Sequence, residues 1–141
     1  MISEDDFRAE ALAFLEGNAK RRQAEVTGWG KGSDKVGLLE EKTPDQERQE
    51  VEEAKAWRQQ KFDAGFGWIT GPAQYGGREL PTTYERLYQS IEAQFDTASQ
   101  SPFGIGLGMV APTILAHATD EVKDAYLRKL YRGEMIACQL F

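Results

Sequence analysis

Residues 65–81 of this 141-residue chain read GFGWITGPAQYGGRELP, and this stretch decides the fold. Five glycines and two prolines in seventeen residues exclude a regular helix. Trp68, Ile69 and Tyr75 place large apolar side chains among these turn residues. The pattern therefore predicts an ordered loop that aromatic side chains fix to a core.

The segment before the loop carries a strong helix start. Thr43 can cap the helix, Pro44 takes the first helical position and Gln46 completes a capping box. The helix should run to about Ala64, since Gly65 comes directly after it. The charged run at residues 46–55 is typical of a solvated face. The side chains expected to be buried are Val51, Ala54, Trp57 and Phe62.

A further helix is predicted near the N-terminus. Ser3 caps it, Asp6 completes a variant capping box, and Ile2 is placed to form a hydrophobic staple with Phe7. Gly17-Asn18 is the predicted stop. Its apolar face consists of Phe7, Ala11, Phe14 and Leu15.

Residues 18–42 are predicted to be a loop or insert, because they are rich in glycine and charged residues. The run KRRQAEV at its start is also compatible with a longer first helix. Trp29 lies between glycines, and we expect it either to dock this loop onto the core or to contact another protein.

Three more helices are predicted after the loop. Residues Thr82 to Glu85 form a capping box, and Thr119-Asp120-Glu121 caps a last helix that ends at Gly133. The inward-facing residues of the first of these helices are Tyr84, Leu87, Tyr88, Ile91 and Phe95, and those of the last are Val122, Tyr126, Leu127 and Leu130.

Between them, residues 103–116 are apolar and contain Gly104, Gly106, Gly108 and Pro112. Each glycine in a helix costs up to ~1 kcal/mol relative to alanine, so we expect something to lie close against this helix. The glycine spacing is not that of a dinucleotide-binding fingerprint, and no strand precedes it. Helix packing is the better interpretation.

Residues 135–141 read MIACQLF, which is apolar and compatible with a strand. A lone strand cannot satisfy its backbone groups, so we expect the sequence to be a piece of a longer protein. The predicted organisation is a helical domain over 1–134 and the start of a truncated middle β-domain over 135–141. The fold class is all-α, an up-down bundle of about five or six helices.

Composition excludes several classes of function. The net charge of 17 − 23 = −6, without a basic stripe, argues against nucleic acid and anionic membranes. No apolar run approaches the ~20 residues of a membrane span, and the N-terminus lacks signal-peptide features. We therefore expect a cytoplasmic protein.

Few residues suit catalysis or metal binding. One histidine and one cysteine leave almost no material for a zinc site. His117 is expected to be a capping or surface residue rather than a general base, and Cys138 a buried, inert thiol. The acidic residues are expected on solvated helix faces, with no acid–base pair among them.

The loop and the residues after it resemble a known family. Gly67-Trp68, Pro72 and Tyr75-Gly76-Gly77, with an amphipathic helix next in the chain, are similar to the N-terminal domain of acyl-CoA dehydrogenases. The likeness continues through the glycine-rich helix and residues 118–123 (ATDEVK) into residues 138–141 (CQLF), and it covers residues 45–141. Ala118 departs from the family's usual glycine, and the 18–42 insert is longer than in many members.

The resemblance implies FAD as cofactor and α,β-dehydrogenation of an acyl-CoA thioester. The catalytic carboxylate would lie beyond residue 141, so the chain alone should be inactive. Gln139 and Phe141 match residues that touch the flavin. Residues that would lie near the acyl chain, unless they are ordinary core residues, are Ser101, Pro102, Ile105 and Met109.

The family also implies partners: an acceptor such as an electron-transfer flavoprotein, and a homodimer or homotetramer. Two alternatives remain open on the sequence. One is a related flavin monooxygenase or oxidase of the same fold. The other is a helical interaction module with no cofactor.

Overall fold

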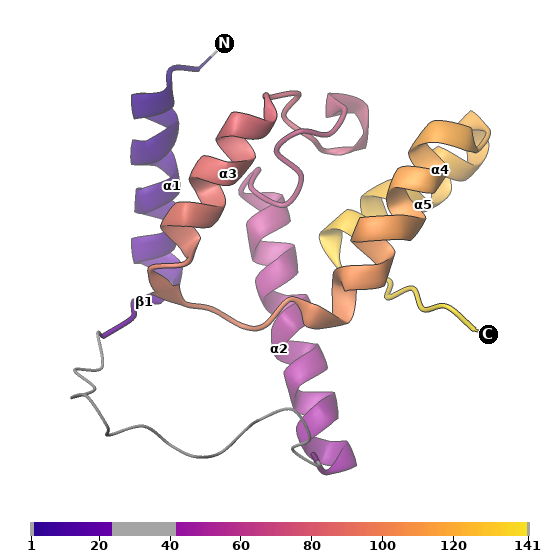
Figure 1. The fold of residues 1–141 in the computed structure, drawn as a ribbon, viewed down its shortest axis with the longest axis horizontal. Coiled ribbons are helices and arrows are strands. Elements are labelled where there is room, and N and C mark those ends of the chain that lie inside the picture. The colour runs from indigo at the N-terminus through magenta and orange to yellow at the C-terminus, as the bar shows by residue number, and fades with distance from the viewer. Residues whose placement is uncertain (1, 24–41, 141) are drawn as a thin grey trace, which may run out of the picture.

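The computed structural model describes residues 2–23 and 42–140 (Figure 1). Across these residues it contains five α-helices: α1 (Glu4–Asn18), α2 (Pro44–Asp63), α3 (Thr82–Glu92), α4 (Ala111–His117) and α5 (Asp120–Arg132). Shorter elements are a two-stranded sheet of β1 (Lys20–Arg21) and β2 (Phe95–Asp96), 3-10 helices η2 (Ala73–Tyr75) and η3 (Ser101–Phe103), and a π-helix η4 (Gly106–Val110). The predicted helical class is confirmed.

Helix α2 lies between two helix pairs (Figure 1). Helices α1 and α3 lie side by side on one flank, and α4 and α5 form the other. Each flank has its own apolar cluster. The first contains Phe7, Leu15, Trp57, Phe66, Tyr88 and Ile91, and the second Phe62, Trp68, Tyr75, Ala111, Leu127 and Leu130. Because α2 and the loop after it contribute to both clusters, they hold the two flanks together.

Two of the predicted capping arrangements are confirmed. The Asp6 amide donates to Ser3 Oγ at 3.1 Å, and Ile2 packs against the cluster that contains Phe7. Thr43 and Gln46 form a complete capping box, in which each side chain bonds the other's backbone amide at 3.3 and 2.9 Å. Helices α1 and α2 therefore begin where local sequence chemistry places them.

Of the other two capping predictions, the one for α3 was wrong, and the one for α5 is confirmed in its position but not in a side-chain hydrogen bond. Helix α3 begins at Thr82 itself with Pro81 as its cap residue, because the Tyr84 amide already donates to the Pro81 carbonyl at 3.0 Å. Thr119 is the cap residue of α5, but its side chain accepts no capping hydrogen bond. A threonine at the right position is thus not sufficient, since its rotamer must also direct the hydroxyl at the helix end.

The alternative of a longer first helix is also wrong for the residues described. Helix α1 ends at Asn18, and Lys20–Arg21 pair antiparallel with Phe95–Asp96. The Arg22 amide and guanidinium then donate to the carbonyls of Gln94 and Phe95, both at 2.9 Å. These long-range bonds occupy the backbone that a helix would need. Trp29 and the rest of the insert from 24 to 41 lie outside the described residues.

The glycine-rich loop is ordered, as predicted. Trp68, Ile69 and Tyr75 are buried, and backbone bonds close the loop on itself, among them Arg78 N to Trp68 O and Leu80 N to Ile69 O. A Cβ on Gly77 would lie 2.0 Å from the carbonyl oxygen of Gly71. Glycine is therefore required where the two arms of the loop touch.

Some expected core residues are not in the core. Leu127 and Leu130 are buried, but Val122 and Tyr126 are 36% and 43% exposed, and Val51 and Leu87 are only partly buried. In the described chain α5 packs through one narrow face, and Val122 and Tyr126 lie beside it. An apolar residue at helical spacing is buried only where a neighbour covers that face.

Residues 135–140 form no strand in the described structure, contrary to the prediction. A strand needs a partner for its backbone groups, and no described segment pairs with this one. Within residues 2–23 and 42–140, no helix combines the length and apolar character needed to cross a membrane.

We predict that Thr43→Ala lowers the free energy of unfolding by about 1 kcal/mol, because it removes a capping bond at the start of α2. Thr119→Ala is the matched control, and it should change stability by less than about 0.5 kcal/mol because that side chain makes no capping bond. Urea denaturation followed by circular dichroism measures both values. Equal losses for the two variants would contradict this account of helix initiation.

Candidate functional site

The glycine-rich segment forms a helix with an irregular middle. After η3 the chain passes through η4 into α4, and the Ala111 amide donates to the Gly106 carbonyl across five residues. Pro112 has no amide hydrogen, so the ordinary ladder cannot continue there. Thr113 Oγ1 donates to the Met109 carbonyl at 2.7 Å and satisfies an oxygen in this interrupted turn. A π-turn of this kind is frequent at functional sites.

The glycines of this helix meet different surroundings. A Cβ on Gly106 would lie 3.6 Å from Ala137, so the C-terminal segment packs against the helix at this position. At Gly104 and Gly108, no atom of the described chain other than the adjacent residues and the backbone of the same helix lies within 4 Å of the position where a Cβ would be. The expected close neighbour is therefore present at Gly106, while the other two glycines face open space.

Two of the predicted acyl-chain residues share this open surface. Ile105 is 39% exposed and Met109 is 51% exposed, beside Gly104 and Gly108. We call the surface formed by these four residues the open face. Ser101 is exposed and Pro102 half-buried in η3, at the start of the same helix.

The predicted flavin residues lie on the segment after α5. Gln139 is exposed, two residues after the contact between Ala137 and Gly106, and Phe141 lies outside the described residues. Cys138 is exposed, so the expectation of a buried thiol was wrong. The reason is the same as for the missing strand, because no described segment covers these residues. His117 is exposed at the end of α4, in agreement with a surface role.

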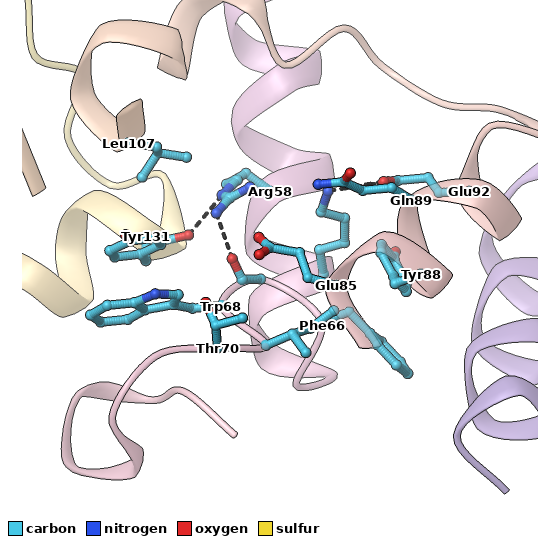
Figure 2. Close-up of a pocket in the computed structure, with 13 residues that line it drawn as sticks. Arg58, Phe66, Trp68, Thr70, Glu85, Tyr88, Gln89, Glu92, Leu107 and Tyr131 are labelled. Carbon is cyan, nitrogen blue, oxygen red and sulfur yellow. Dashed lines mark hydrogen bonds and ion pairs between the residues drawn. The ribbon is translucent and has the colours of Figure 1, made fainter. Parts of the chain in front are cut away.

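A cavity of about 340 Å³ lies elsewhere, between α2, α3, the loop and α5 (Figure 2). Arg58 on α2 is central to it and is only 7% exposed. Its Nε donates to the Tyr131 carbonyl at 2.8 Å and its Nη2 to the Gly67 carbonyl at 2.6 Å. Burial lowers the pKa of Arg58, and nearby Tyr131 and Glu92 oppose that shift.

A second buried cation lies one helical turn further on. Lys61 Nζ is 3.2 Å from both carboxylate oxygens of Glu92, which also accepts a bond of 2.9 Å from the Trp57 indole. Burial lowers the pKa of Lys61, and Glu92 partly offsets this. Burial also raises the pKa of Tyr88, whose hydroxyl has no hydrogen-bond partner in the described part of the chain.

Sequence reasoning missed this cavity and was wrong to expect every acidic residue on a solvated face. The Glu92 side chain is largely buried. A signal for the cations was present, because Ala54, Trp57, Arg58 and Lys61 have the helical spacing of a buried face. The spacing was missed because Arg58 and Lys61 are charged, and charged residues were expected on the solvated face of the helix. Among the described residues, no group of three or more His, Cys, Asp or Glu could hold a metal ion.

The helical fold, the aromatic loop and the glycine-rich helix together define a domain of the acyl-CoA dehydrogenase type. A family model described as Acyl-CoA dehydrogenase, N-terminal domain, matches residues 3–134. The chain therefore belongs to this family, whose members use FAD. Comparison with curated proteins and comparison with solved structures each gave no match.

We predict opposite effects of alanine at two glycines. Gly104 has helical backbone angles and open surroundings, so Gly104→Ala should raise the free energy of unfolding by up to about 1 kcal/mol. Gly77→Ala should lower it by about 2 kcal/mol or more, because its Cβ would collide with a backbone carbonyl. Thermal and urea unfolding of the chain test both, and a destabilising Gly104→Ala would show that this position is not open.

Proposed function

We propose that this chain is the N-terminal helical domain of an FAD-dependent acyl-CoA dehydrogenase that introduces a double bond between the α and β carbons of an acyl-CoA thioester. In this proposal the domain supplies part of the wall of the acyl pocket and part of the flavin site. The catalytic base is expected on polypeptide outside residues 1–141. The family match over residues 3–134 is the starting point.

The open face is the observation that carries the proposal. Gly104 and Gly108 lower the stability of the helix, and no side chain of the described residues fills the space beside them. Ile105 and Met109 expose apolar area on the same surface. A surface of this kind suits an apolar ligand that needs room, such as an acyl chain enclosed between this helix and further polypeptide.

The residues near the C-terminus fit a flavin. The Gln139 side chain is exposed and makes no bond to any described residue, so its carboxamide can both donate to and accept from the edge of a flavin ring. The contact between Ala137 and Gly106 holds this segment beside the glycine-rich helix. FAD would supply the acceptor for the β hydride. Phe141 is assigned to the same site by the resemblance.

In this arrangement the residues of the helix have separate roles. Ile105 and Met109 would contact the acyl chain and exclude water, while Ser101 and Pro102, in η3 at the start of the same helix, would also lie near the acyl chain. A homodimer or homotetramer that passes electrons to an acceptor such as an electron-transfer flavoprotein completes the proposal.

The protein produced from the complete gene tests the assignment. We expect it to purify yellow with the visible absorbance of oxidised FAD, and we expect anaerobic addition of a saturated acyl-CoA to bleach that absorbance with formation of the 2-enoyl product. A colourless protein that binds no added FAD, or a flavoprotein that no acyl-CoA reduces, would contradict the proposal.

The acyl-pocket role of Met109 has its own test. Met109→Ala should lower kcat/KM for the preferred acyl-CoA about tenfold, because it removes apolar area that the chain would bury, and it should leave flavin content unchanged. Val51→Ala, in the N-terminal half of α2, is the control for a general loss of apolar packing. Equal kcat/KM values for Met109→Ala and the wild type across acyl chain lengths would remove Met109 from the pocket.

A further inference from the structure

The cavity between α2, α3, the loop and α5 contains polar atoms that form no hydrogen bond with a described residue. Arg58 makes two hydrogen bonds, through Nε and Nη2, and its Nη1 has no partner among the described residues. Glu85 on α3 lines the same cavity and forms no hydrogen bond or ion pair with a described residue. Figure 2 shows its carboxylate directed toward the Arg58 guanidinium. A free donor and a free acceptor therefore face one space.

The charges in the cavity balance. Lys61 and Glu92 form a direct pair, which leaves Arg58 and Glu85 with one positive and one negative charge. An anionic ligand would bring a carboxylate against Glu85, and a cationic ligand would bring a positive charge against buried Arg58. Either case leaves an uncompensated charge in a partly desolvated site. The cavity thus favours a neutral ligand that accepts a hydrogen bond from Arg58 and donates one to Glu85.

Besides these charged groups, the lining has a polar part, with Thr70, Tyr88 and Gln89, and an apolar part. Trp68 and Tyr131 stack with ring centroids 3.6 Å apart and an angle of 5° between their planes, and Phe66, Ile69 and Leu107 complete the surface. A volume of about 340 Å³ is at the small end of ligand pockets, which span about 300–1,000 Å³. Because the faces of Trp68 and Tyr131 cover each other, this aromatic part offers apolar contact of the edge-to-face kind, which suits the ring of a small planar molecule.

We propose that this cavity is a binding site for a small, planar, neutral carboxamide. The amide oxygen accepts from Arg58 Nη1, the amide N–H donates to the Glu85 carboxylate, and the apolar body of the ligand lies against the aromatic wall. The site is separate from the open face, and its occupation does not depend on the proposed dehydrogenase activity.

Three probes of one shape and different charge test this inference. Benzamide, benzoate and benzamidinium are titrated into the chain, and binding is followed by ligand-detected NMR and by the fluorescence of Trp68 and the other tryptophans. We expect saturable binding of benzamide, and binding at least about tenfold weaker for the two charged probes, because each loses one charge-assisted hydrogen bond and gains a repulsion.

Glu85→Gln then separates the cavity from any other site. This variant should still fold, because Glu85 makes no hydrogen bond in the described chain and the carbonyls of Gly67 and Tyr131 continue to satisfy Arg58. It leaves Arg58 as the unbalanced charge. We expect benzamide to bind about tenfold more weakly and benzoate more tightly than to the wild type. Glu47→Gln, on an exposed position of α2, is the matched control and should change neither affinity.

Four results would overturn the inference. They are the absence of saturable benzamide binding, equal affinity for all three probes, affinities that Glu85→Gln leaves unchanged, and loss of folding in Glu85→Gln. The first means that the cavity holds water only. The second and third mean that Arg58 and Glu85 do not recognise the ligand. The fourth means that Glu85 has a structural role instead.

Discussion

The buried guanidinium of Arg58 is the interaction on which the arrangement of this domain depends. It binds the Gly67 carbonyl of the loop and the Tyr131 carbonyl of α5, and so it ties both to α2. A charge at this depth is tolerated because backbone carbonyls satisfy it. Its neighbour Gly133 has φ +82°, and a Cβ there would lie 2.8 Å from Arg58 Cγ. The end of α5 can approach only because that residue is glycine.

This connection decides which surfaces remain uncovered. Once α5 is fixed against α2, its buried leucines hold α4 and η4, and the opposite side of the glycine-rich helix faces outward. Gly104 and Gly108 then lie over open space together with Ile105 and Met109. Residues that lower stability, such as these glycines, are commonly retained where function needs the space. The open face is therefore a consequence of how the two flanks are joined.

The same helix borders both candidate sites. Leu107 lines the cavity, while its neighbours Ile105 and Gly108 belong to the open face. The irregular turn η4 contributes residues to both sites, and Pro112 is the reason that the regular ladder ends there. A group bound in the cavity would thus lie beside Leu107, on the same turn that carries Gly108 and Met109 of the open face.

The sequence alone determined the features that depend on neighbouring residues. The capping residues Ser3 and Thr43, the ordered loop at 65–81, the helical class and the family could all be predicted, because turns, caps and amphipathic spacing are local chemistry. The tertiary structure decided the rest: the pairing of Lys20–Arg21 with Phe95–Asp96, the burial of Arg58 and Lys61, and the exposure of Val122, Tyr126 and Cys138. Each of these depends on a segment distant in the sequence, which either covers a side chain, bonds to it or leaves it open. Local spacing can mark a helix face as buried, as it does for Arg58 and Lys61, but it does not identify the distant segment that covers the face, and only the folded chain shows that segment.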